Sequence, residues 1–165
     1  MTRLIIAGSR GFDPDRIAKS GLAPDMTIDQ INSVVRRFLF LTIDTAYTSL
    51  ALGLADRTIE KVVSGGAVGV DTYGEQWARQ EGIPVRRFLP EYEKFKNKRA
   101  APLARNVEMA AHGTALIAIS LGESTGTAHM MRVARDHGLP VAAIHVPDET
   151  LSRVLRYSTH FFLAT

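Results

Sequence analysis

The stretch Arg3–Phe12 reads RLIIAGSRGF, and it decides the fold. Residues 3–7 are almost continuously apolar, which is typical of a strand buried on both faces of a parallel sheet. The apolar run gives way at once to Gly8, Ser9, Arg10 and Gly11. Glycine lets a ligand approach the main chain closely, and a serine and an arginine can hydrogen-bond an anion. The stretch therefore predicts a buried strand that ends in a ligand-binding turn.

Four further stretches of the same character predict the rest of a sheet, at residues 60–64, 84–89, 114–120 and 140–146. Segments of helical character lie between them, the clearest at residues 28–52, 71–81 and 126–137. Alternating strands and helices build parallel sheets with right-handed crossovers. We therefore expect an α/β, Rossmann-like, doubly wound fold, with a mainly parallel sheet of about five strands and helices on both faces.

The parts outside this alternation are expected to be irregular or accessory. Residues 13–26 and 91–104 are the most loop-like interior stretches, and residues 147–165 read as a C-terminal extension of a single domain that spans residues 1–165. The tail at residues 157–163 (YSTHFFL) is apolar for a chain terminus. Docking of the tail on the body or on a second copy would explain this. The long helix at 28–52 and the tail together offer more apolar surface than a small sheet can cover. We therefore expect a homodimer or a larger homo-oligomer.

Composition limits the classes of function. The 165 residues are 45% apolar, which is enough for the core of a single domain. They contain no cysteine, and the five histidines include no pair at metal-ligand spacing. No apolar run is long enough to cross a bilayer. We expect a cytoplasmic protein that binds no metal, no cofactor and no membrane, and whose net charge of +3 permits an anionic partner.

Three of the predicted strands are followed by glycine-rich turns, at residues 8–11, 64–71 and 122–127. The carboxyl ends of parallel strands meet at one edge of the sheet, where open α/β sheets bind ligands. None of the turns has the spacing G-x-G-x-x-G or G-x-x-x-x-G-K-[ST], which argues against hydride transfer and ATP hydrolysis. With strand order 3-2-1-4-5, the first and third turns form the walls of the switch-point crevice, and Arg10 becomes the counter-charge for a phosphate.

Four motifs in this order resemble a known family: GSRGF (8–12), SGGAVGVD (64–71), RNVEM (105–109) and LGESTGTAHM (121–130). They resemble the YspA-type branch of the SLOG superfamily, over residues 3–146. That superfamily also contains the LOG-type cytokinin-activating phosphoribohydrolases and the DprA DNA-processing proteins. The resemblance implies a Rossmann-like fold and a nucleotide or nucleotide-derived ligand.

The turns and the resemblance together nominate a set of ligand-binding residues. They are Gly8, Ser9, Arg10, Ser64, Gly65, Gly66, Asp71, Arg105, Asn106, Gly122, Ser124, Gly126 and Thr127. Asp71 is equally well suited to capping the helix that follows it and to accepting hydrogen bonds from a ribose. A sensing or sequestering module is the first hypothesis.

Hydrolysis of a nucleotide N-glycosidic bond is the alternative. The LOG enzymes use a glutamate at the position where this chain has Met130. Another carboxylate would therefore have to stabilise the oxocarbenium-like centre at the anomeric carbon or activate a water molecule there. Asp71, Glu75 and Arg105 are the candidate catalytic residues in that case, although Glu75 could equally form a surface salt bridge. A second alternative is single-stranded DNA binding, as in the DprA relatives, through the basic cluster Lys94, Lys96, Lys98 and Arg99.

Overall fold

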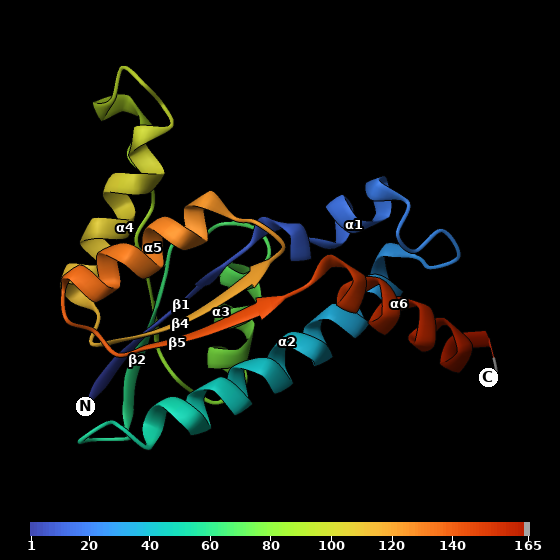
Figure 1. Cartoon of the computed structure of the whole chain (residues 1–165), viewed down its shortest axis with the longest axis horizontal. Coiled ribbons are helices and arrows are strands. Elements are labelled where there is room, and N and C mark those ends of the chain that lie inside the picture. Colours follow the sequence, from blue (N-terminus) through green and yellow to red (C-terminus); the bar gives the residue numbers. More distant parts are fainter. Residues whose placement is uncertain (164–165) are drawn as a thin grey trace.

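Five parallel strands form one sheet in the computed structural model of the chain (Figure 1), which describes residues 1–163 and the side chains of residues 1–159. The strands are β1 (Thr2–Gly8), β2 (Ile59–Ser64), β3 (Val85–Arg87), β4 (Ala115–Leu121) and β5 (Val141–Val146). Their order is β3-β2-β1-β4-β5, and every neighbouring pair is parallel. The predicted α/β class and the predicted strand order are therefore confirmed.

Six α-helices accompany the strands within the described residues. They are α1 (Pro14–Ser20), α2 (Ile28–Ala51), α3 (Val70–Gln80), α4 (Ala100–His112), α5 (Thr125–Asp136) and α6 (Asp148–Leu163), and two short 3-10 helices, η1 (Arg10–Phe12) and η2 (Tyr92–Lys94), join them. Within these residues, no helix combines the length and the apolar character that a bilayer crossing needs.

The alternation of side chains along β1 explains why helices cover both faces of the sheet. Leu4 and Ile6 pack in one apolar cluster with α2 and α3, while Ile5 and Ala7 pack in a second cluster with α4 and α5. Figure 1 shows α4 and α5 on one side of the sheet and α2 on the other. This is the doubly wound arrangement, and it leaves the carboxyl ends of β1 and β4 open between the two layers.

The long helix α2 begins where its capping signal predicts. Thr27 Oγ1 accepts a hydrogen bond from Gln30 N at 3.2 Å, and Gln30 Oε1 accepts one from Thr27 N at 2.9 Å. These two bonds satisfy amides that a helix start otherwise leaves unpaired.

Two of the expectations for these segments need correction. Residues 13–26 contain helix α1, which Asp13 caps by accepting a hydrogen bond from Arg16 N at 3.3 Å. Strand β3 is only three residues long, shorter than the predicted 84–89, because only Val85–Arg87 pairs with β2. The C-terminal extension is helix α6, whose Leu151 and Leu155 join the cluster around α2. The side chains of Phe161, Phe162 and Leu163 lie outside the described residues, so the docking of the tail stays a prediction.

Candidate functional site

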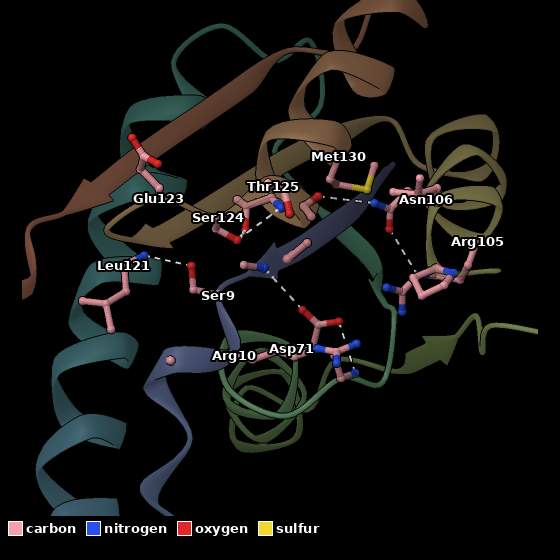
Figure 2. A pocket seen from close by; sticks show the side chains of 18 of the residues that line it. Ser9, Arg10, Asp71, Arg105, Asn106, Leu121, Glu123, Ser124, Thr125 and Met130 are labelled. Carbon is pink, nitrogen blue, oxygen red and sulfur yellow. Dashed lines mark hydrogen bonds between the residues drawn. The ribbon is translucent and has the colours of Figure 1, made fainter. Parts of the chain in front are cut away.

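A pocket of about 670 Å³ opens at the carboxyl ends of β1 and β4 (Figure 2). Its walls come from the turns after β1 and β2, from α1 and α4, and from the starts of α5 and α6. The volume falls in the range of small-molecule sites, and the position is the switch point at which open α/β sheets bind ligands. The predicted residues that line it are Gly8, Ser9, Arg10, Asp71, Arg105, Asn106, Ser124, Gly126 and Thr127.

Ser9 holds the walls of this pocket together. Its hydroxyl accepts a hydrogen bond from Leu121 N at 2.9 Å, as Figure 2 shows, and its amide donates to Ile119 O at 3.0 Å. Its carbonyl accepts a hydrogen bond from Val70 N at 3.3 Å. The predicted ligand residue Ser9 therefore ties β1 to β4 and to the start of α3, and its hydroxyl proton is what it has left to offer a ligand.

Gly8 is required by the close packing at this edge. A Cβ atom at this position would lie 2.7 Å from Val70 Cγ2 and would overlap the carbonyl oxygen of Ile119. Any side chain would push β1 away from β4 or from α3. The glycine thus lets the two walls of the pocket meet.

Asp71 lies at the floor of the pocket with only 3% of its surface exposed. Oδ1 accepts a hydrogen bond from Gly8 N and Oδ2 one from Ala67 N, both at 3.3 Å. Burial raises the pKa of this carboxyl to about 6, although the Arg105 guanidinium and the two amides act to lower it. The group therefore titrates closer to neutral pH than an ordinary aspartate does.

Arg105 projects from α4 toward the same floor. One terminal nitrogen donates to Gly65 O, and Nε donates to Asn106 Oδ1 at 3.2 Å. Burial lowers the pKa of Arg105, and the nearby Asp71 carboxylate raises it. Gly65 makes this possible, because a Cβ there would overlap the guanidinium and would lie 2.8 Å from Asp71 Oδ2.

Asn106 links α4 to α5 beside the pocket (Figure 2). Its Nδ2 donates to Gly126 O at 3.4 Å and lies 3.2 Å from His129 Nδ1. Burial and the nearby Arg132 lower the pKa of His129, which favours the neutral ring as the acceptor of the second bond. The pair Asn106 and His129 thus fixes the distance between the two helices.

The start of α5 forms the wall opposite the β1 turn. Ser124 caps the helix by accepting a hydrogen bond from Thr127 N at 3.4 Å, and its hydroxyl lies 2.8 Å from Thr127 Oγ1. The first amides of a helix have no intrahelical acceptor, and they carry the positive end of the helix dipole. A Cβ built on Gly126 would meet no atom within 4 Å, so open space adjoins the backbone there.

Two exposed arginines complete the lining, Arg10 from η1 and Arg16 from α1. Within the residues whose side chains are described, neither guanidinium forms an ion pair or a hydrogen bond. Arg10 also acts on Arg105, since its charge contributes to the lowered pKa of that group. Arg16 was missed because residues 13–26 were interpreted as a loop, although Asp13 and Pro14 are signals of a helix start.

The structure keeps some predicted residues outside the pocket. Its lining does not include Ser64, Gly65, Gly66 or Gly122, although the carbonyl oxygen of Gly65 accepts a hydrogen bond from Arg105. Glu75, 2% exposed, accepts hydrogen bonds from Ser64 Oγ at 2.8 Å, Arg87 Nε at 2.8 Å and Arg79 at 3.1 Å. Burial alone would raise its pKa, but the bonds from Arg87 and Ser64 outweigh it and hold the pKa below its ordinary value.

Sequence reasoning missed the lining residues that lie outside the predicted turns and that only the fold brings together: Ala7, Arg16, Pro102, Leu103, Met109, Leu121 and Asp148. Gly11, Ala67, Glu123 and Thr125 lie within the predicted turns and also line the pocket. Met130, the residue at the position of the LOG glutamate, does line the pocket, and it is buried. Among the residues that the structure describes, no three histidines, aspartates or glutamates gather as a metal site would require.

The basic cluster around η2 lies apart from the pocket lining. Lys94 forms an ion pair with Glu91, and Lys98 Nζ donates to the carbonyl oxygen of Tyr92 at 2.7 Å. Two of its four charges are therefore engaged within the loop itself. Binding of single-stranded DNA stays a prediction from the sequence.

One comparison with known proteins finds a relative. The chain is 40% identical over 84 residues to the Gene 61 protein of Mycobacterium phage D29, and the match covers 48% of this chain and 67% of that protein. No family model matches the chain, and no solved structure does.

Proposed function

Since this chain belongs to the same family as the Gene 61 protein of phage D29, whose name describes no activity, we propose its function from the pocket itself. The protein binds a nucleotide or a nucleotide-derived small molecule, as a sensing or sequestering module. The resemblance to the SLOG superfamily is part of this proposal.

One observation carries it: the pocket at the switch point is lined both by the guanidinium of Arg10, which has no partner among the side chains that the structure describes, and by the start of α5. A phosphate placed there would accept hydrogen bonds from the first amides of the helix and from the guanidinium. The open space beside Gly126 lets phosphate oxygens reach the backbone. This combination favours phosphate over a neutral ligand.

The floor of the pocket suits a sugar. Each carboxylate oxygen of Asp71 accepts one backbone hydrogen bond and keeps a second lone pair for a hydroxyl donor. Leu103, which is 40% exposed, adds apolar surface to the lining, against which a base can pack. A nucleoside phosphate offers the matching groups in one molecule.

Isothermal titration calorimetry with a panel of nucleoside monophosphates, nucleoside diphosphates and ADP-ribose compounds tests the proposal. Arg10→Ala should weaken binding by about 10- to 100-fold, as expected for the loss of charged hydrogen bonds. Arg135→Ala is the matched control, because Arg135 is exposed in the last turn of α5, at the other end of the helix from the pocket. If Arg10→Ala binds every ligand as tightly as the wild-type chain does, the turn after β1 is not a phosphate site.

Hydrolysis of an N-glycosidic bond is a second candidate, favoured by the buried Asp71 carboxyl in the pocket, with its pKa raised to about 6 beside Arg105. A carboxylate at the pocket floor could stabilise an oxocarbenium-like centre. Glu75 is a weaker candidate, because it lies outside the pocket and its carboxylate already accepts hydrogen bonds from two arginines and Ser64. Release of free base from a nucleotide by the wild-type chain, and its loss in Asp71→Asn, would establish this activity. If the nucleotide is still intact after prolonged incubation, the protein binds nucleotides without cleaving them.

A further inference from the structure

Building on the proposed function, we infer that the ligand carries two adjacent phosphates and that Arg16 binds the second of them. The inference starts from a guanidinium that a single phosphate at this site would leave unused. The start of α5 and Arg10 together provide enough donors for a single phosphate. Arg16 is a further guanidinium in the same lining, and the sequence motifs assign it no role.

Arg16 is positioned by the fold for this task. It lies in the first turns of α1, where its backbone amide donates to the capping carboxylate of Asp13. Its side chain reaches the pocket lining, whereas Lys19 on the same helix does not. Because Arg10 and Arg16 belong to two consecutive short helices, η1 and α1, they present two separate cationic groups along the mouth.

The charges of the pocket favour an extended anion over a compact one. Arg10, Arg16 and Arg105 line one cavity together with three carboxylates, those of Asp71, Glu123 and Asp148. Glu123 and Asp148 belong to the same lining, so phosphates are stabilised only where they lie close to the arginines. Arg105 is buried and bonded to Gly65 and Asn106, which leaves the exposed Arg10 and Arg16 as the two phosphate contacts.

The burial of the lining residues indicates which part of the ligand lies at the floor of the pocket and which part lies at its mouth. Asp71 is buried at the floor, while Arg10 and Arg16 are exposed at the mouth. A nucleoside diphosphate, or a dinucleotide joined through a pyrophosphate, would place its ribose near Asp71 and both phosphates toward the mouth. Nucleoside monophosphates would fill the first phosphate position only.

The test compares mono- and diphosphates of the same nucleosides by calorimetry, with AMP and ADP, GMP and GDP, CMP and CDP, and UMP and UDP as probes. Wild-type protein should bind the diphosphate of at least one nucleoside about tenfold more tightly than its monophosphate. Arg16→Ala should abolish that preference, because it weakens diphosphate binding about tenfold more than monophosphate binding, whereas Arg10→Ala should weaken both. Arg135→Ala should alter neither, and circular dichroism should show that all three variants are folded.

The outcomes separate this inference from the function on which it rests. Equal affinity for mono- and diphosphates, or an equal loss of both in Arg16→Ala, would overturn the role of Arg16 and leave nucleotide binding in place. Failure of the wild-type chain to bind any nucleotide, including ADP-ribose, would overturn the proposed function together with this inference.

Discussion

Asp71 and Arg105 face each other across Gly65, at the floor of the pocket. The guanidinium is near enough to lower the pKa of the carboxyl, yet among the described residues the two groups form no ion pair within 4.0 Å. Each is held by other partners, Asp71 by two backbone amides and Arg105 by Gly65 and Asn106. The two charges therefore interact without direct contact, so a ligand that binds between them should change the pKa of Asp71.

Asp71 should make the protein less stable as the pH rises. Its pKa is raised from 3.8 to about 6 on folding, so the folded state holds this proton more tightly than the unfolded state does. The resulting stabilisation is fully present below about pH 4 and is lost as the pH passes 6, a change of roughly 3 kcal/mol by linkage. Urea unfolding of wild type and Asp71→Asn across this pH range should show the loss only in the wild type. Parallel pH profiles for the two proteins would contradict it.

Glu75 should have the opposite pH dependence. Its pKa is held below the ordinary value, so it stabilises the folded protein above the ordinary pKa of a glutamate, and that contribution is lost as the pH falls through the folded value. The stability difference between wild type and Glu75→Gln should be largest near neutral pH and should shrink in acid. Urea unfolding at a series of pH values measures it. A difference that grows on acidification would show that the ion pairs with Arg87 and Arg79 do not stabilise the fold.

Replacing Arg105 should destabilise the protein and raise the pKa of Asp71. Arg105→Gln removes the positive charge that opposes the effect of burial on Asp71, and it disturbs the hydrogen bonds to Gly65 and Asn106. We expect a loss of about 2–4 kcal/mol at pH 7 that becomes smaller at pH 5, where Asp71 is protonated. NMR titration of the Asp71 carboxyl carbon provides the second measurement, and a pKa that does not rise would refute the coupling.

Two glycines of the pocket should respond in opposite ways to the same added methyl group. Gly8→Ala forces a Cβ against Ile119 and Val70, so it should lower the free energy of unfolding by about 2 kcal/mol or more. Gly126→Ala adds a methyl group in open space within a helix, where alanine is favoured by about 0.5–1 kcal/mol. It should nevertheless weaken nucleotide binding, because the methyl group would occupy the space beside the helix start. A Gly126→Ala variant that binds as wild type would place the phosphate elsewhere.

A homodimer is expected to form through α2 and α6. These helices border a groove of about 580 Å³, lined by Ser33, Val34, Arg37, Phe38, Leu41, Val154 and Ser158. Leu41 is 60% exposed there, and Tyr157, from α6, is 69% exposed. Leu41→Glu should convert the dimer to a monomer in light scattering. Leu52→Glu should not, because Leu52, which is 74% exposed, lies just after the end of α2. A wild-type monomer at micromolar concentration would refute the expectation.

The sheet was predictable because its signals are local. Each predicted strand is a short, largely apolar run, three of the five are followed by glycine-rich turns, and the alternation with helices leaves few topologies open. Helix α1 was not predicted, because its seven residues bury only Ile17 and so show no periodicity. Strand β3 was overestimated for a related reason, since residues 84–89 are apolar or basic along their whole length but only three of them find a partner strand.

The site was predictable in part. Motif residues that follow strands, such as Arg10, Asp71 and Gly126, do reach the pocket, because the carboxyl ends of parallel strands converge there. Glu75 follows Asp71 by one helical turn and yet lies outside it, because Arg87 on β3 engages its carboxylate. Arg16 and Asp148 reach the pocket from helices that no motif covers, so only the three-dimensional packing identifies them.

The bonds of Ser9 bear on how fast a ligand could enter. Because its hydroxyl, amide and carbonyl already hold β1, β4 and α3 together, both walls of the pocket are in place before any ligand arrives. Association would then need no rearrangement of these turns, so its observed rate would rise linearly with ligand concentration, without a plateau. The encounter would be governed by diffusion and by the pull of the exposed arginines on an anion, and the residence time would set the affinity.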